Sequence, residues 1–255
     1  MMNNTITKIK TTLKNRPIPI WQFDQVHMFE NDCLLHAKEI LPTIRNKKLI
    51  FIGDSDCISL TLLLLLEEGS KFLPKQITVL DFDLRLLQFI EDTASKINHG
   101  IKLDTVLHNL KYPIHNSTKE KYDFFHINPP FGSQNGGYSL KFWLYRAIDS
   151  CKEKCDGCII MGNPSQYNWA KIAYDNLLLE LKRLNFADRI TMEIKHKYYS
   201  YWDLSLTSQS ILVSSAKKII SPIHSSEFSN KEMLNIYGDT LELPEYITEE
   251  KKLGY

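Results

Sequence analysis

The 255-residue chain carries 31 Lys and Arg side chains against 30 Asp and Glu, which leaves a formal net charge of +1. This balance argues against a strongly basic nucleic-acid-binding surface and against an acidic surface that collects cations. The longest apolar run, residues 58–66, is too short to cross a bilayer, and the N-terminus has lysines but no apolar signal segment. Five cysteines without an export signal predict reduced thiols in a cytoplasmic protein.

Apolar runs and segments of helical spacing alternate along the chain. Strands are expected at residues 47–52, 76–81, 101–109, 121–127, 157–163, 189–196 and 208–215. Helices are expected at residues 57–69, 84–97, 138–152 and 166–185. Because the first five strands are apolar, the pattern predicts a Rossmann-like α/β fold with a mostly parallel sheet covered on both faces. The last two strands have no helix between them, which predicts an antiparallel hairpin at one edge.

The same pattern predicts three parts of the chain. Residues 1–46 form an N-terminal helical extension, residues 47–218 a catalytic Rossmann-like domain, and residues 219–255 a C-terminal tail. The tail is mixed in charge, and it is expected either to cover the site as a lid or to pack against the domain.

Polar or turn-forming residues follow four of the predicted strands. They are Gly53–Asp56, Asp81, Asn109 and Asn128–Phe131. In open parallel sheets, ligands bind outside the carboxyl ends of the strands. The sequence therefore predicts a binding site at this edge of the sheet.

The stretch FFHINPPFGSQNGG, residues 124–137, is the most specific signal in the chain. Two prolines in a row cannot continue a central strand, so Pro129 and Pro130 predict a stiff turn. The side-chain carbonyl of Asn128 and the backbone carbonyl of Pro129 can each accept a hydrogen bond from one amine. A planar base can stack on Phe131. The turn predicts a site that positions an amine nitrogen for alkylation.

The acidic residues after the first two strands favour a cationic ligand. Gly53-Asp54-Ser55-Asp56 has one glycine and two carboxylates, which would repel a pyrophosphate, although the same residues also suit a capped helix start. Asp81 is expected to bind the ribose hydroxyls of an adenosine moiety. Asn109 is a candidate contact for the adenine of such a cofactor.

Two further segments have open interpretations. Cys151, Cys155 and Cys158 have the spacing of a radical iron–sulfur signature, but they span a predicted helix–strand junction, so we expect packing residues and no metal site. The run KHKYYSYWDLS, residues 195–205, either lines the lip of the pocket, with Tyr199 and Trp202 as substrate contacts, or forms a packed corner of the sheet.

The overall plan resembles the class I S-adenosylmethionine-dependent transferases. Over roughly residues 16–215, the chain is similar to the branched-chain polyamine synthase family, which attaches aminopropyl groups to spermidine; the shared stretches are RPIPIWQFDQ, FIGDSDCIS, TVLDFDLRLLQFI, HNLKYPI, YDFFHINPPF and FWLYRAI. That family has Gly-Asp-Asp-Asp where this chain has residues 53–56, and Asp-Pro-Pro where this chain has Asn128.

A second, shorter resemblance covers INPPFGSQNGG, which looks like the catalytic turn of methyltransferases that modify the exocyclic amine of adenine. By that match, Asn128, Pro129 and Pro130 hold the amine and Phe131 stacks on an extruded base. Asp54 or Asp56 would then bind the donor's amino group. On the polyamine interpretation, they would bind the attacking amine, with Asp56 as the general base.

These resemblances imply a transferase that alkylates an amine nitrogen. We favour S-adenosyl-L-methionine as the cofactor and an adenine of RNA or DNA as the substrate, because adenine is uncharged and suits an amide and an aromatic ring. The first alternative is aminopropyl transfer from decarboxylated S-adenosylmethionine to a polyamine. The second is a non-catalytic binding module.

Overall fold

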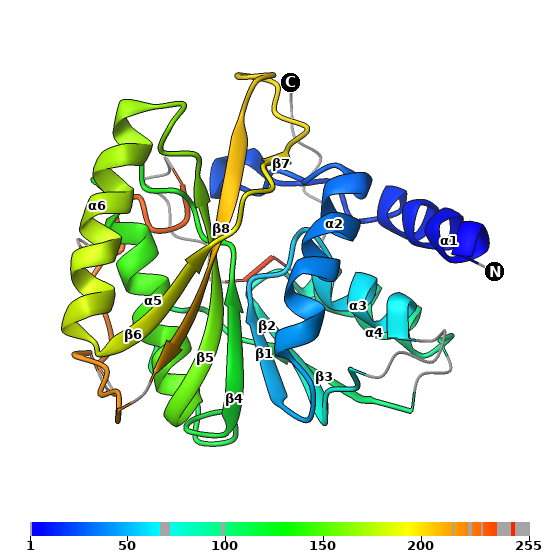
Figure 1. Ribbon diagram of the computed structural model, residues 1–255, viewed down its shortest axis with the longest axis horizontal. Helices are drawn as coiled ribbons and strands as arrows, with labels where there is room; N and C mark the ends of the chain where they lie inside the picture. Colours follow the sequence, from blue (N-terminus) through cyan, green and yellow to red (C-terminus); the bar gives the residue numbers. More distant parts are fainter. Residues whose placement is uncertain are drawn as a thin grey trace.

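The computed structural model describes residues 2–66, 72–97, 100–215, 217–223, 226–230, 232–238 and 246–247. Its centre is one mixed sheet with the strand order β3-β2-β1-β4-β5-β8-β6, and β7 pairs with β8 (Figure 1). The parallel strands are β1 (Lys48–Ile52), β2 (Gln76–Asp81), β3 (Lys102–Leu107), β4 (Tyr122–Ile127) and β5 (Cys151–Gly162). The predicted Rossmann-like α/β fold is confirmed.

The antiparallel edge consists of β6 (Phe186–Thr191), β7 (His196–Lys197) and β8 (Thr207–Ser215). Strand β8 lies between β5 and β6 and runs antiparallel to both. The single strand expected at residues 189–196 is therefore two strands, β6 and β7, which pair with different parts of β8. The antiparallel pairing itself is as predicted.

Strand β5 begins six residues earlier than its apolar pattern indicates. It continues directly from α5 (Tyr138–Ser150), and its first half exposes the charged side chains of residues 152–154 while burying Cys151 and Cys155. These exposed charges hid the first half of the strand in the sequence, because the start had been expected at an unbroken apolar run.

Helices cover both faces of the sheet. On one face lie α2 (Glu30–Ile40), α3 (Ile58–Leu66) and α4 (Leu84–Ala94), and α1 (Met2–Lys14) packs outside α2 and α3 (Figure 1). On the other face lie α5 and α6 (Asn168–Arg183). Short 3₁₀ helices occur at Trp21–Phe23 and Leu41–Thr43. The two faces carry separate apolar clusters, so the sheet has a core on each side.

The helical extension and the tail both contribute to these cores. Ile9 and Leu13 of α1 are buried with the α2–α3–α4 face. In the tail, Phe228, Ile236 and Tyr237 are buried with the α5–α6 face. The described part of the tail is packed against the domain, which is one of the two arrangements expected for it; most of the segment LELPEYITEEKKLGY lies outside the described residues.

Arg146 joins the tail to the loop after β3. Its side chain is fully buried in α5, where it donates to the backbone oxygens of Leu110 (2.8 Å), Lys111 (3.1 Å) and Ser226 (2.8 Å). Its guanidinium also lies 3.6 Å from the Asp149 carboxylate. One buried side chain thus satisfies polar groups from three segments, and each group would be costly to leave unpaired.

We expect Arg146→Met to lower the free energy of unfolding by about 3 kcal/mol, because it leaves Asp149 and three backbone oxygens without their buried partner. Urea unfolding measures the change. Lys171→Met is the control, because Lys171 forms an exposed pair with Asp175 that should contribute less than about 1 kcal/mol. Equal stability of the two variants would contradict the linking role of Arg146.

Candidate active site

The polar strand ends meet at one edge of the sheet, as the sequence predicts. In the parallel register, Ile52 at the end of β1 lies opposite Leu80 of β2 on one side and Ile127 of β4 on the other. The backbone N–H of Asp54 donates to Asp81 Oδ2 across 3.2 Å. The residues that follow β1, β2 and β4 therefore surround a common site.

Asp54 starts α3. Its Oδ1 accepts from the backbone N–H of Ile58 (2.8 Å), and its Oδ2 accepts from that of Ser59 (3.1 Å), so the capped-helix interpretation is correct for this residue. Burial, with a smaller contribution from the neighbouring Asp56 charge, raises the pKa of Asp54 to about 8. A cofactor role for Asp54 stays a prediction.

Asp81 ends β2 with both oxygens facing backbone donors. Besides the Asp54 N–H, it accepts from the Asp83 N–H at 2.9 Å. Burial, together with the Asp83 charge, raises the pKa of Asp81 to about 7. At neutral pH, this carboxyl group is poised between its neutral and ionised forms, and a nearby positive charge would favour ionisation. That behaviour suits a cationic ligand.

Asp56 has a different environment, because three separate segments bond to it. It accepts from the backbone N–H of Met28 (2.6 Å) and from Nδ2 of Asn128 (2.7 Å), and the Arg16 guanidinium lies 3.8 Å away. Burial raises the pKa of Asp56, while Arg16 and the two hydrogen bonds act in the opposite direction. Arg16 was not recognised as a site residue, because a single Arg before a proline carries no specific pattern.

The bond to Asp56 fixes the orientation of the Asn128 amide. An ionised carboxylate only accepts hydrogen bonds, so Asn128 presents its NH₂ group to Asp56 and turns its carbonyl oxygen the other way. The buried Pro129 and Pro130 follow at once and hold the turn. The bond to Asp56 thus leaves the side-chain carbonyl of Asn128, which is a hydrogen-bond acceptor, on the side away from Asp56.

Phe131 is half-buried beside Tyr198, with ring centroids 6.1 Å apart in an edge-on arrangement. Tyr199 and Trp202, which were expected as substrate contacts, are about half exposed at 51% and 49%. Tyr199 donates to Glu30 at 2.7 Å, and Trp202 lies edge-on to Trp21. The aromatic residues of the segment 195–205 therefore have two environments. Tyr198 contacts Phe131 of the Asn-Pro-Pro-Phe turn, whereas Tyr199 and Trp202 lie at the surface.

Two of the predicted cofactor contacts are covered by other parts of the chain. Gly53 has a φ of +69°, and a Cβ atom there would lie 2.6 Å from the ring of Trp143, so only glycine fits. Asn109 Oδ1 accepts from the Tyr237 hydroxyl at 3.0 Å, and that hydroxyl accepts from the Leu110 N–H at 2.7 Å. Their cofactor roles stay predictions.

The three cysteines do not converge on one site. Cys151 and Cys155 are buried with the α5–α6 face, whereas Cys158 is buried with the opposite face. Burial raises the pKa of the Cys151 and Cys158 thiols well above the usual value. The iron–sulfur signature is therefore a coincidence of spacing.

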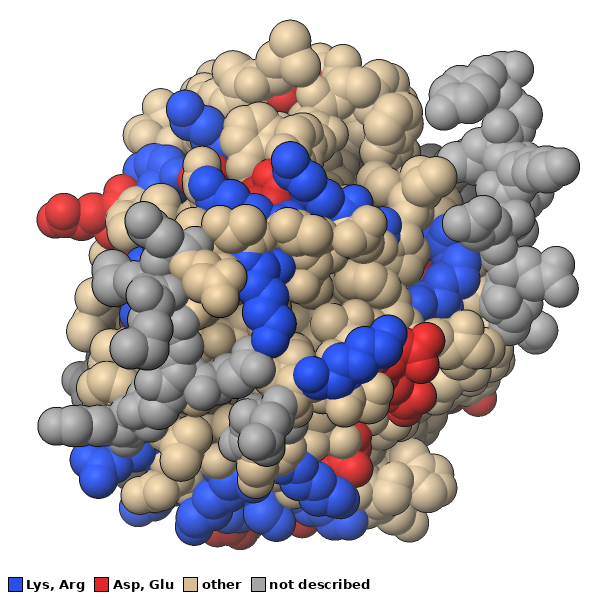
Figure 2. Space-filling view, turned by 90° about the vertical axis from the view of Figure 1, so that its right-hand side faces the viewer, with Lys and Arg blue, Asp and Glu red and all other residues tan. Residues whose placement is uncertain are grey.

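The described residues of the face shown in Figure 2 form no single basic track across it. Their Lys and Arg side chains form several groups, the largest along the lower edge of the view, with uncharged residues and carboxylates between the groups. Nucleic-acid-binding domains usually gather their basic side chains into a patch or stripe. Among the described residues, no helix has the length and apolar character that a membrane span requires.

Comparison with known proteins agrees with the geometry. Residues 4–236 match the family described as the branched-chain polyamine synthase A C-terminal domain. The N(4)-bis(aminopropyl)spermidine synthase of Methanocaldococcus jannaschii is 27% identical over 150 residues, which are 58% of this chain and 39% of that protein. The corresponding synthase of Thermococcus kodakarensis is 32% identical over 130 residues, which are 49% of this chain and 34% of that protein. The matched part therefore spans less than half the length of these relatives.

Among solved structures, a branched-chain polyamine synthase mutein from Thermus thermophilus has a TM-score of 0.71 at 18% identity and covers 92% of this chain and 69% of its own. At this identity, the likeness establishes the fold. The match over residues 4–236 establishes the family: the chain belongs to the branched-chain polyamine synthase A C-terminal domain family.

Proposed function

We propose that this protein transfers an aminopropyl group from decarboxylated S-adenosylmethionine to a nitrogen atom of a polyamine. The observation that carries the proposal is the family match over residues 4–236. It favours aminopropyl transfer over methyl transfer to adenine in RNA or DNA, the function that the Asn-Pro-Pro-Phe turn alone had favoured. The Thermus thermophilus structure holds N4-aminopropylspermidine and 5'-methylthioadenosine, and the latter is what decarboxylated S-adenosylmethionine becomes after losing its aminopropyl group.

The acidic edge of the sheet supports a polycationic substrate. The carboxyl groups of Asp54, Asp56, Asp81 and Asp83 are all buried there. The raised pKa of Asp54 and of Asp81 means that an arriving cation would ionise them and gain attraction as they lose protons. A polyamine and a sulfonium donor both carry the required positive charge.

In the reaction, an uncharged amine nitrogen attacks the methylene carbon bonded to the positive sulfur. The new C–N bond forms as the C–S bond breaks, and a neutral thioether leaves. The Asn128 carbonyl and the Pro129 carbonyl accept the N–H bonds of the amine and point its lone pair at that carbon. The nitrogen then loses one proton, and Asp56, whose carboxylate accepts from Asn128 Nδ2, is proposed as the general base.

The donor's adenine is proposed to bind at the end of β3. Asn109 Oδ1 offers an acceptor and the Leu110 N–H a donor, which match the N6 amine and N1 of adenine. The Tyr237 hydroxyl now forms the same two bonds, and its ring lies 4.7 Å from that of Phe82. Tyr237 and the adenine would therefore compete for one place.

Donor discrimination tests the proposed function directly. Calorimetric titration should show that decarboxylated S-adenosylmethionine binds at least about tenfold more tightly than the intact molecule, because a carboxylate would meet an acidic site. With spermidine present, methylthioadenosine should accumulate. A preference for the intact molecule with methylation of adenine would overturn the proposal, and binding of neither would identify a non-catalytic module.

For Asn128→Ala, we expect turnover to fall by about 100-fold with donor affinity nearly unchanged, because the variant removes an acceptor that orients the amine. Asn128→Asp is the matched variant: it keeps an acceptor oxygen but replaces the NH₂ donor to Asp56 by a second carboxylate, so its turnover should fall less than that of Asn128→Ala. Steady-state kinetics and calorimetry separate the two effects. Wild-type turnover in Asn128→Ala would exclude the turn from catalysis.

For Tyr237→Phe, we expect the donor to bind about tenfold more tightly, because the tail loses two hydrogen bonds of about 1 kcal/mol each while the donor keeps its own. Tyr174→Phe on α6 is the control, since its hydroxyl has only a long contact, 3.4 Å, with Thr191. An unchanged or weaker affinity in Tyr237→Phe would place the adenine away from Asn109.

A further inference from the structure

A group of buried metal-ligand side chains lies on the α2 face of the sheet and has no part in the proposed reaction. His36 and Glu39 come from α2, His196 from β7 and Ser210 from β8; we call these four residues the histidine cluster. His36, His196 and Ser210 are fully buried, and the Glu39 side chain is 5% exposed. Residues from separate elements thus place nitrogen and oxygen ligands around one interior point.

The separations within the histidine cluster suit a shared cation. Glu39 Oε2 lies 3.4 Å from His36 Nδ1 and 3.3 Å from His196 Nε2. Ser210 Oγ lies 3.4 Å from both His36 Nδ1 and Glu39 Oε2. Charge-assisted hydrogen bonds are usually about 2.7–2.9 Å long, so these contacts are loose as direct bonds. Ligand atoms about 2.0–2.1 Å from a tetrahedral metal lie roughly 3.3–3.4 Å from one another.

Two buried atoms beside this point lack a partner. Among the described residues, Glu39 Oε1 and His126 Nδ1 have no hydrogen-bond partner. Glu39 Oε1 belongs to the carboxylate whose other oxygen, Oε2, faces His36 and His196, so an ion bound at Oε2 would also lie beside this unpaired oxygen.

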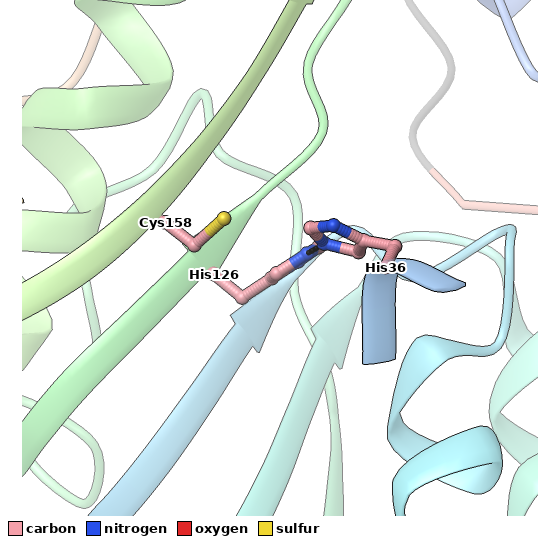
Figure 3. Close-up of side chains that lie close together, drawn as sticks. All are labelled: His36, His126 and Cys158. Carbon is pink, nitrogen blue, oxygen red and sulfur yellow. Dashed lines mark hydrogen bonds between the residues drawn. The ribbon is translucent and has the colours of Figure 1, made fainter. Parts of the chain in front are cut away.

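The second nitrogen of each histidine has a partner, as metal-bound histidines require. If His36 binds the ion through Nδ1, its Nε2–H donates to His126 Nε2 at 2.8 Å, the contact seen in Figure 3. If His196 binds through Nε2, its Nδ1–H donates to Ser208 Oγ at 3.3 Å.

A second possible group, formed by His36, His126 and Cys158, fits a metal less well. Figure 3 shows the Cys158 thiol pointing toward the two rings. The two Nε2 atoms are only 2.8 Å apart, which suits an N–H···N hydrogen bond and is too close for two ligands of one tetrahedral ion. Burial raises the pKa of the Cys158 thiol well above its usual value, whereas a metal needs the thiolate.

We propose that His36 Nδ1, Glu39 Oε2 and His196 Nε2 bind one divalent transition-metal ion of the zinc class, with the Ser210 hydroxyl as the fourth ligand. Two imidazoles and a carboxylate form a donor set that zinc takes in proteins. Because four protein ligands close the coordination sphere, the ion is structural. It ties α2 of the N-terminal extension to β7 and β8 at the antiparallel edge.

The test uses the purified full chain, stripped with a chelator and titrated with Co²⁺ as a spectroscopic probe and with Zn²⁺ in competition. We expect one ion per chain, with the visible absorption of tetrahedral cobalt and without the intense near-ultraviolet band of a cobalt–thiolate bond. Absence of binding, or the appearance of the thiolate band, overturns the proposal. The cobalt spectrum of the wild-type protein therefore tests the metal site even if a variant fails to fold.

Two variants then assign the ligands. Glu39→Gln should weaken Zn²⁺ binding by at least about 100-fold, because it replaces the only anionic ligand. Cys158→Ser, the control in the neighbouring group, should bind Zn²⁺ as the wild type does. Circular dichroism checks that both are folded; should Glu39→Gln not fold, Glu39→Asp replaces it and should also weaken binding. Equal affinity of the Glu39 variant and the wild type overturns the assignment.

Discussion

The buried carboxylate of Asp56 is the constraint on which the site depends. A buried anion without partners costs several kcal/mol, so the fold has to bring donors to it. The donors come from segments far apart in the sequence: Arg16 and the Met28 N–H from the N-terminal extension, and Asn128 from the turn after β4. Satisfying one carboxylate therefore docks the extension onto the sheet and orients the amide that faces the substrate.

The same constraint changes how the acidic edge acts on a ligand. A cluster of ionised carboxylates would attract a polyamine strongly but would also repel itself. Here Asp56 is bonded to Arg16 and Asn128, and burial raises the pKa of Asp54 and of Asp81. The site can thus be folded with little uncompensated charge and become anionic when a cation enters. Asn128 fits this scheme, because an Asp at that position would place a second carboxylate next to Asp56.

The sequence predicted what depends on local patterns. Strand–helix alternation indicated the parallel sheet, and the polar residues after β1, β2 and β4 indicated its active edge. The charged residues 152–154 concealed the start of β5, because three consecutive exposed charges interrupt an apolar run. Tyr199 and Trp202 stay predicted substrate contacts, and composition alone did not tell that Tyr198, in the same run, turns inward against Phe131.

Contacts between segments far apart in the sequence could not be predicted from such local patterns. Arg16 meets Asp56 across 40 positions, and Tyr237 meets Asn109 across 128. The histidine cluster shows even more clearly that contacts between distant segments cannot be read from local sequence patterns. His36 and Glu39 share one helix face, but His196 and Ser210 join them only because β7 pairs with β8 and both lie beneath α2. No ligand spacing along the chain reveals that arrangement, so the sequence predicted no metal site.

The histidine cluster and the catalytic turn are linked through β4. His126 Nε2 lies 2.8 Å from His36 Nε2 on the α2 side, and Asn128, two residues later, donates to Asp56 at the carboxyl edge. Alternate residues of a strand point to the same face, and Asn128, directly after β4, continues this alternation toward the loop between β1 and α3. Contacts on the α2 side therefore hold the end of β4 at two successive points. That double attachment explains how a turn without regular backbone hydrogen bonds can keep its amide in a fixed orientation.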